Sequence, residues 1–339
     1  MRLIKHVENT IYVKRLEELL SYKQMTDSGN KYRVRAYRNA IREISRLEFP
    51  IKRVEDLEYL EIGDRLRSKL AELVTTGHIK ELDELKKDPV VKSTIELSLV
   101  HGLGPSRVQE LINLGITSIV KLRSAVRHKK VILTNHQEIG LRYYKGLQEK
   151  ASTIELEKYI AKFTKLLDDH KDELDLGSSK LNIKIIIVGS FSRGNKKFHN
   201  DLDIIVTSSK LKTQKSMKKI GFLQKITKVL IKYGFIVDLI SSGSTKTMGI
   251  ILDPKIGKYA HHLDVYAIPY NNIQLGEMYL SSGGMFNIYM ASLLKKRGFT
   301  YGLNGVYHTE TKTKVRIASD KAVFKLARIG FIPKNERQL

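Results

Sequence analysis

Apolar residues recur at helical spacing through the first part of the chain. This pattern predicts helices over residues 12–22 and 32–47, separated by a polar break at 27–30. Residues 57–79 are predicted to form a short helix, a tight turn at 62–63 and a second helix. This outline is a helix-hairpin-helix, whose turn presents backbone N–H groups to a phosphate of a nucleic-acid backbone.

A second pattern of the same kind lies at residues 100–116. Gly102-Leu103-Gly104 predicts the turn, and Pro105 and Ser106 suit the first turn of the next helix. The alternative is a plain pair of helices joined by a glycine turn. Two binding hairpins would hold duplex DNA at two places. Residues 134–147 are predicted to be a further basic, amphipathic helix.

The second half of the chain alternates between strand and helix patterns. An apolar, β-branched run at 183–188 predicts a buried strand, and a second run at 204–206 predicts another. Further strands are predicted at 235–240, 247–252 and 261–268, and helices at 154–168, 218–233, 286–297 and 320–326. The basic last residues, 332–339, are predicted to be a frayed tail.

The composition narrows the class of partner. The chain has 339 residues and 60 Lys and Arg against 36 Asp and Glu, so its formal net charge is +24. This excess of cations indicates a polyanionic partner, most simply nucleic acid. An anionic membrane would require an anchor, and the sequence has no apolar run of about 18 residues and no signal-peptide core. The absence of cysteine excludes disulfides and thiolate chemistry, and an intracellular protein is expected.

The predicted helix over 32–47 and its flank are unusually basic. Tyr32 and Tyr37 lie among six cations, which are Lys31, Arg33, Arg35, Arg38, Arg42 and Arg46. Aromatic rings interleaved with cations favour a surface that contacts phosphates. The alternative is a solvated helix face.

Candidate chemistry is concentrated between residues 183 and 206. Gly189 and Ser190 follow the first strand, and Arg193 and then Asp201-Leu202-Asp203 come next. Carboxylates at i and i+2 of a strand point to the same face, where two like charges are costly unless a cation lies between them. Mg²⁺ fits, because it prefers hard oxygen ligands and leaves room for phosphate. The segment predicts a site for a nucleoside triphosphate and metal, and the alternative is a glycine turn before solvated carboxylates.

Asp264, in the predicted strand over 261–268, is a candidate third carboxylate. A carboxylate among β-branched and aromatic residues is unfavourable for a strand, which favours a functional role. The alternative is an aspartate on an edge strand that faces water. His261 and His262 are candidate metal ligands, but contacts with phosphate or backbone are favoured, because no other His lies at zinc-like spacing.

Lys69 lies in the helix predicted after the first turn. An exposed lysine is the simplest interpretation. If Arg65 and Arg67 crowd it, Lys69 would instead be an amine nucleophile that attacks an aldehyde.

The order of these parts resembles that of the family X DNA polymerases. The resemblance runs over nearly the whole chain, and its motifs are two hairpins, GSFSRG at 189–194, DLD at 201–203, Asp264, YLSSGGMFN at 279–287 and GFTYG at 298–302. It implies an α+β multidomain fold, in which all-helical helix-hairpin-helix domains precede a nucleotidyltransferase-type palm with a mixed β-sheet and a C-terminal α+β subdomain. The implied divisions are a lyase-like domain (1–84), a DNA-binding subdomain (85–150), a catalytic palm (151–270) and a subdomain that binds the nascent base pair (271–339).

The resemblance also implies roles for single residues. Asp201, Asp203 and Asp264 would hold two Mg²⁺ ions, with Mn²⁺ as a substitute, and Asp264 would lie nearest the primer 3′-hydroxyl. The implied nucleotide-binding residues are Gly189, Ser190, Arg193, Lys150, Tyr279, Phe286 and Asn287. Lys69 would be the Schiff-base amine that removes 5′-deoxyribose phosphate. The implied DNA-binding residues are Gly63, Arg65, Gly102, Gly104, Ser106, Arg33 and Tyr37.

The implied activity is DNA-directed gap filling in base excision repair, on gapped or nicked DNA with a dNTP, by a monomer in the nucleus or cytoplasm, or in a viral factory for a viral member. The chain departs from the family pattern at Glu81, His262, Gly284 and Ala291, and YLSSG at 279–283 stands in place of the usual YFTGS. Glu81 replaces a phosphate-binding Lys, and the other departures favour an error-prone enzyme. The alternatives are a template-independent terminal nucleotidyltransferase and a catalytically silent DNA-binding scaffold.

Overall fold

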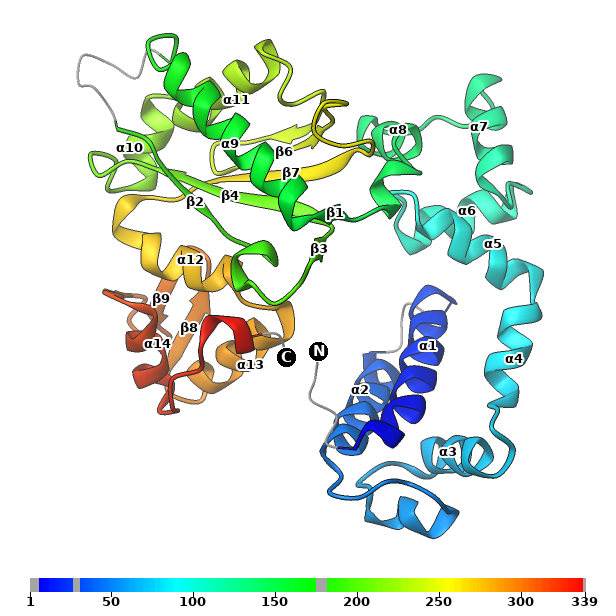
Figure 1. Cartoon of the computed structure of the whole chain (residues 1–339). Coiled ribbons are helices and arrows are strands. Elements are labelled where there is room, and N and C mark those ends of the chain that lie inside the picture. The colour runs from blue at the N-terminus through cyan, green and yellow to red at the C-terminus, as the bar shows by residue number, and fades with distance from the viewer. Residues whose placement is uncertain (1–5, 27–30, 175–181, 338–339) are drawn as a thin grey trace. The chain divides into compact units, whose positions relative to one another are not determined.

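The computed structural model describes residues 6–26, 31–174 and 182–337. The chain divides into two compact units, Met1–Arg142 and Tyr143–Leu339, each of which has its own packing (Figure 1). The finer division into four parts stays a prediction. No helix in the described ranges is both long and apolar enough to cross a membrane.

The first unit begins with helices that bury one apolar face each. They are η1 (Val7–Asn9), α1 (Thr10–Thr26), α2 (Lys31–Arg46), η2 (Val54–Tyr59), α3 (Asp64–Thr76) and α4 (Lys80–Lys87). Leu16, Ile44 and Leu70 meet in their common core. The two predicted helices are confirmed, whereas the predicted break at 27–30 lies outside the described residues. The first hairpin opens with a 3₁₀ helix, and α3 ends at Gly77, whose left-handed φ of 76° suits glycine.

The second hairpin follows in the same unit. Its helices are α5 (Pro89–Ser98) and α6 (Pro105–Asn113), and α7 (Ile119–Arg127) and α8 (Asn135–Arg142) follow them. Gly104 precedes α6 and Pro105 opens it, as predicted. Helix α8 passes so close to the hairpin turn that a Cβ on Gly140 would lie 1.9 Å from the carbonyl oxygen of His101. The helix predicted over 134–147 stops at Arg142, and the short η3 (Gly146–Gln148) follows it.

A five-stranded mixed sheet forms the centre of the second unit. Its order is β2 (Lys184–Ile187), β4 (Asp201–Thr207), β7 (His261–Ala267), β6 (Lys246–Ile251) and β5 (Asp238–Ser242). Strands β4 and β7 are parallel, and the other neighbours are antiparallel. A separate, two-stranded antiparallel sheet is formed by β1 (Ala151–Ser152) and β3 (Phe198–His199). Strand β2 is only partly buried, contrary to prediction, because it is an edge strand.

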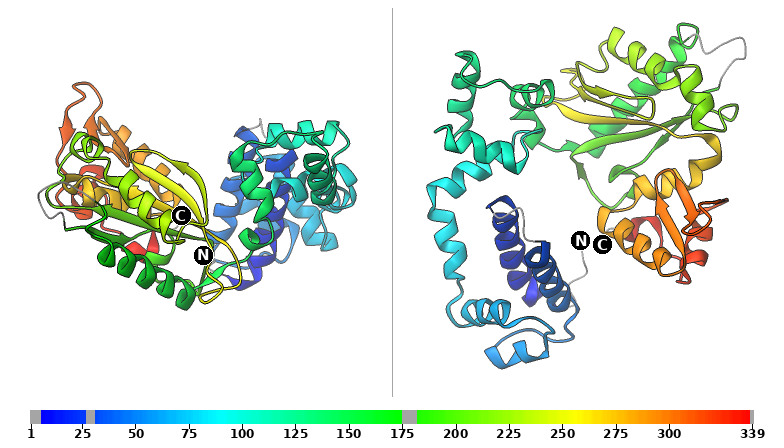
Figure 2. Two further views of the ribbon diagram at one scale, coloured as in Figure 1. Left: turned by 90° about the horizontal axis from the view of Figure 1, so that it is seen from above. Right: turned by 180° about the vertical axis from the view of Figure 1, so that it is seen from behind.

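Helices cover both faces of this sheet. α9 (Thr153–Asp169), α10 (Gln214–Lys219) and α11 (Phe222–Lys232) pack on one face, and α12 (Ile273–Ser281) lies on the other (Figure 1; Figure 2). The helix predicted over 218–233 is confirmed as α11, but it begins at Phe222, because Gly221 takes a left-handed φ of 63° and separates α10 from α11. Strand β5 also begins three residues later than predicted.

The remainder of the second unit is a smaller α+β layer. It contains η5 (Tyr270–Asn272), α13 (Gly284–Lys295), β8 (Phe299–Gly302), β9 (Gly305–His308), β10 (Lys314–Val315), α14 (Asp320–Ala327) and η6 (Lys334–Glu336). The three strands form an antiparallel sheet in the order β10-β9-β8. Phe286, Met290 and Phe324 are buried between this sheet and its helices.

The predicted frayed tail is wrong for the described residues up to 337. Arg337 is 2% exposed, and its guanidinium lies 5.1 Å and 5.3 Å from the ring centroids of Phe324 and Phe331. It also pairs with Asp320 at 2.7 Å and donates to the carbonyl oxygen of Ile332 at 2.8 Å. A buried cation with ring and carboxylate partners holds the segment in place.

Candidate active site

Three carboxylates lie on one face of the central sheet. In the parallel pair, Asp203 of β4 is opposite Asp264 of β7, and Asp201 is opposite His262. Leu202 and Leu263 are fully buried on the other face, against α9 and α11. Side chains alternate along a strand, so Asp201, Asp203 and Asp264 share the opposite face. The alternative of an edge-strand Asp264 is wrong, because β7 is the middle strand of five.

Gly189 closes this carboxylate face at the end of β2. Its φ is +68°, and a Cβ placed on it would lie 2.0 Å from Oδ2 of Asp203. The backbone N–H of Val188 donates to the carbonyl oxygen of Asp203 at 3.0 Å. Glycine is required here both for the backbone conformation and for the close approach of the carboxylate.

The site carries excess negative charge. Burial and the neighbouring charges of Asp201 and Asp264 raise the pKa of Asp203 to about 7. Burial and Asp264 likewise raise the pKa of Asp201. Hard oxygen ligands whose mutual repulsion favours protonation are a donor set that fits a divalent cation, which would relieve that repulsion.

Lys246 already compensates one of the carboxylates. Its Nζ lies 2.7 Å from Oδ2 of Asp264, and the hydroxyl of Tyr266 donates to the same oxygen at 3.1 Å. The ammonium also lies 5.0 Å from the ring centroid of Tyr266. In the part of the chain that the structure describes, no group of three His, Cys, Asp or Glu side chains is already gathered around a metal position. Sequence reasoning missed Lys246, since only the register of β6 on β7 brings it there.

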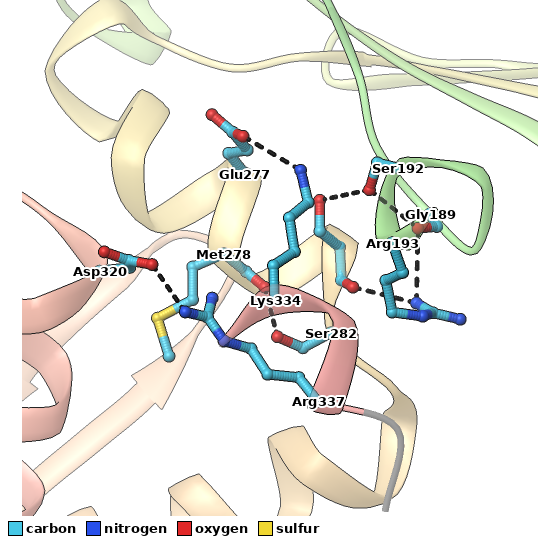
Figure 3. Close-up of polar contacts among 10 residues, drawn as sticks. Gly189, Ser192, Arg193, Glu277, Met278, Ser282, Asp320, Lys334 and Arg337 are labelled. Atoms are coloured by element: carbon cyan, nitrogen blue, oxygen red, sulfur yellow. Dashed lines mark hydrogen bonds and ion pairs between the residues drawn. The ribbon is translucent and has the colours of Figure 1, made fainter. Parts of the chain in front are cut away.

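Arg193 and Ser192 link the loop after β2 to the end of α12. Arg193 Nη1 donates to the carbonyl oxygens of Ser281 at 3.0 Å and Gly189 at 3.4 Å (Figure 3). The hydroxyl of Ser192 donates to Ser281 Oγ and to the carbonyl oxygen of Gly189, both at 3.0 Å. The loop expected to bind phosphate is thus tied to the end of α12.

The C-terminal segment is tied to the same region. Lys334 pairs with Glu277 of α12 at 3.3 Å (Figure 3). The N–H of Gly283 donates to the carbonyl oxygen of Arg337 at 2.6 Å. Asn195 donates to the carbonyl oxygen of Asn335 at 2.8 Å. Residues 332–337 therefore hold both the loop and the segment after α12.

Two further candidates for binding the nucleotide are Ser190 and Lys150. Ser190 Oγ lies 3.2 Å from Nδ1 of His199, and burial lowers the pKa of His199. Lys150 is exposed beside β1, which pairs with β3 just before the carboxylate strand.

The candidates for the sugar and base pocket lie around Asn287. Asn287 donates to the carbonyl oxygen of Tyr279 at 2.8 Å and accepts from the hydroxyl of Tyr301 at 2.9 Å. The rings of Tyr279 and Tyr301 are 5.4 Å apart. Phe286 is fully buried in the core of this layer, 6.1 Å from the ring centroid of Phe324, so its side chain does not line the pocket as expected.

The two histidines beside Asp264 have different surroundings. His261 is 1% exposed and pairs through Nε2 with Glu155 of α9 at 3.2 Å. It lies on the core face, away from the carboxylates. His262 shares the face of Asp201, its register partner.

Lys69 lies in a cluster of charges within the first unit. Glu81 of α4 contacts Lys69 through Oε2 and Lys23 of α1 through Oε1, the latter at 2.5 Å. The cation that shares Glu81 with Lys69 is therefore Lys23. Arg67 donates to the carbonyl oxygens of the hairpin turn, including that of Leu60 at 3.0 Å, and Arg65 is exposed.

The DNA-binding candidates divide by exposure. Gly63, Arg65, Gly102, Gly104 and Ser106 are exposed at the two hairpin turns, and Gly102 has a left-handed φ of 89°. Arg33 is partly buried. Tyr37 is 3% exposed in the helical core, so its ring does not form part of the surface.

Three protein-family models match separate parts of this chain. A helix-hairpin-helix domain matches residues 7–79, the fingers domain of DNA polymerase lambda matches 95–148, and the DNA polymerase beta palm matches 159–270. The palm match contains all three carboxylates, and the other two contain the hairpins.

Whole proteins with these parts are also similar. The DNA polymerase lambda of Rattus norvegicus is 24% identical over 80% of this chain, and that of Arabidopsis thaliana is 24% identical over 92%. The DNA polymerase type-X family protein pol4 of Schizosaccharomyces pombe is 27% identical over 59%. The matches cover 45%, 59% and 37% of those relatives, so the chain spans about half of their length.

Proposed function

Since the chain belongs to the family X DNA polymerases, we propose that it extends the primer 3′-end in short DNA gaps under the direction of the template strand. The observation that carries this proposal is the register that puts Asp203 opposite Asp264, with Asp201 on the same face and Gly189 against them. The reaction is in-line transfer of a nucleotidyl group from a dNTP to the primer hydroxyl.

Asp201, Asp203 and Asp264 are proposed to hold two Mg²⁺ ions, with Mn²⁺ as a substitute. Bound there, the ions would neutralise charge on the phosphates and lower the pKa of the primer 3′-hydroxyl. The burial and the neighbouring carboxylates that raise the pKa of Asp203 support this assignment. Asp264 contributes its carboxylate once Lys246 releases it.

The dNTP is proposed to lie along the loop after β2. Ser190 and Arg193 offer donors to its phosphates, with Lys150 nearby, and Gly189 allows the backbone to approach closely. Tyr279 and Asn287 would contact the sugar and base. The replacements at His262, Gly284 and Ala291 underlie the further proposal that incorporation is error-prone.

The first unit is proposed to hold the DNA and to remove 5′-deoxyribose phosphate. The exposed hairpin turns at Gly63 and at Gly102 and Gly104 suit contacts with the DNA backbone. Lys69 is the proposed Schiff-base amine. Such a monomer would act in base excision repair inside the cell, in the nucleus or cytoplasm.

The decisive experiment is extension of a labelled primer on a duplex with a one-nucleotide gap and a 5′-phosphate, with each dNTP tested separately. Asp264→Ala should lose at least about 10³-fold in rate, since it removes a metal-binding carboxylate. Asp169→Asn, an exposed carboxylate at the end of α9, is the matched control and should extend normally.

The alternatives give different results in the same assay. Extension of a primer without any template would identify a terminal transferase. Binding of gapped DNA without any extension would identify a silent scaffold. Addition of noncomplementary dNTPs only when a template is present would support the error-prone proposal, and strict selection of the complementary dNTP would contradict it.

A further inference from the structure

The charge cluster around Glu81 joins three helices of the first unit. Glu81 of α4 contacts Lys69 of α3 with Oε2 and Lys23 of α1 with Oε1. The side chains are 32%, 26% and 17% exposed respectively, so the cluster is sheltered but open to a ligand. Burial alone would raise the pKa of Glu81, but the hydrogen bonds from Lys23 and Lys69 outweigh it and lower that pKa.

The surroundings fix the position of the carboxylate. Tyr37 is buried beside the cluster, and burial together with the charge of Glu81 raises its pKa to about 12. α3 and α4 share a buried core that includes Leu70 and Leu82. A surface ion pair would leave its partners free to move, whereas here each oxygen of Glu81 has its own lysine.

We propose that Glu81 is the general base for the elimination step of the Lys69 lyase reaction. The inference rests on the lyase activity proposed above for Lys69. No role in catalysis follows from the sequence pattern, in which Glu81 merely replaces a phosphate-binding Lys.

The chemistry places Glu81 next to the proton that must be removed. Lys69 Nζ attacks C1′ of the open-chain sugar aldehyde, water leaves, and a protonated imine remains. C2′ is bonded to the same carbon as Nζ, so a carboxylate in contact with Nζ is within reach of the C2′ proton.

The elimination then balances without any further reagent. Glu81 takes the C2′ proton, and the electron pair of the C–H bond forms an enamine. The enamine expels the 3′-phosphate as the C3′–O3′ bond breaks, which leaves the DNA with a 5′-phosphate and Lys69 bound to an unsaturated sugar. Water hydrolyses this imine and frees Lys69.

Lys23 keeps Glu81 ionised until it takes the proton. The protonated imine retains a positive charge where the Lys69 ammonium was, and Lys23 stays on the other oxygen of Glu81. The carboxylate is therefore paired but unprotonated at neutral pH, as a general base must be.

The test separates imine formation from elimination, using the full chain and a gapped duplex that carries a 5′-deoxyribose phosphate. Borohydride trapping measures the imine, and release of the sugar phosphate measures the elimination. Glu81→Gln should trap within about twofold of the natural protein but release the sugar phosphate about 10²-fold more slowly. Glu81→Asp should recover part of the rate.

The matched control is Glu84→Gln, an exposed carboxylate on the same helix, which should change neither readout. Lys69→Arg should abolish trapping. Release by Glu81→Gln at the natural rate would overturn the role of Glu81 and leave the lyase proposal standing. Equal loss of trapping and release would mean that Glu81 only positions Lys69, which also overturns it. If the natural protein does not trap, the lyase activity and the role of Glu81 fail together, and gap filling by the same sample shows that it is folded.

Discussion

Lys246 and Asp264 form an ion pair across the neighbouring strands β6 and β7, with 2.7 Å between Nζ and Oδ2. The ammonium therefore competes with any metal ion for the carboxylate that the proposed mechanism assigns to the primer hydroxyl. A divalent cation that binds Asp264 would have to displace Lys246, so the free energy of breaking this ion pair would reduce the affinity for the cation.

Lys246→Met should strengthen metal binding in the absence of DNA. A partly exposed ion pair contributes up to about 1 kcal/mol, so the affinity for Mn²⁺ should rise about threefold to fivefold. Calorimetric titration with Mn²⁺ measures this directly. Lys210→Met, an exposed lysine after β4, is the control, and weaker binding in Lys246→Met than in that control would contradict the competition.

The contribution of Asp203 to the stability of the metal-free protein should fall as the pH rises from about 4 to 7. The folded state raises the pKa of Asp203 to about 7, so in this window it binds more protons than the unfolded chain. Asp203→Asn should therefore be more stable than the natural protein at pH 8, by on the order of 2 kcal/mol, and equally stable near pH 4. Thermal unfolding with a chelator measures both.

Addition of Mg²⁺ at pH 8 should reverse that order. The ion should raise the Tm of the natural protein more than that of Asp203→Asn, because the amide is a poorer ligand than the carboxylate. An equal rise in Tm for both proteins would remove Asp203 from the metal site.

Gly189→Ala should abolish gap filling. Its Cβ would lie 2.0 Å from Oδ2 of Asp203 and would displace that carboxylate. Gly194→Ala is the matched control, because Gly194 has a similar φ of 69° but open space around it. The control should lose about 1 kcal/mol of stability from backbone strain alone. Primer extension and thermal unfolding of both variants separate the loss of activity from the loss of stability. An active Gly189→Ala protein would contradict the prediction.

Arg337→Met should destabilise the second unit by about 2–4 kcal/mol. The substitution removes the pair with Asp320, the bond to Ile332 and two ring contacts from a buried position. Lys325→Ala, exposed on α14, should stay within about 0.5 kcal/mol of the natural protein. Chemical unfolding monitored by tyrosine fluorescence measures both, and equal midpoints would mean that the C-terminal segment is not held by Arg337.

Local sequence patterns predicted most helices and the strands that carry the three carboxylates. The alternation in β4 and β7 is enough to put Asp201, Asp203 and Asp264 on polar positions of their strands. It does not supply the register between strands, so the contact of Lys246 with Asp264 could not be anticipated.

The positions that the sequence pattern did not explain depend on a backbone conformation or on partners that are distant in sequence. Gly221 resembles a tolerated glycine within an amphipathic helix, and only its left-handed φ reveals the end of α10. Arg337 lies in a polar, basic stretch, where burial is unexpected because its ring and carboxylate partners come from distant positions. Glu81 likewise meets Lys23 and Lys69 through helix packing alone.

The pairing of Asp203 with Asp264 also constrains the order in which this protein can mature. The chain between them contains α10, α11, β5 and β6, so the contact is distant in sequence, although the two residues are direct neighbours in the sheet. Contacts of this kind form late, because a long segment must be ordered first. During synthesis the two hairpins leave the ribosome before β7 does, so under the proposed function a nascent chain would pass through a stage that binds DNA without chemistry.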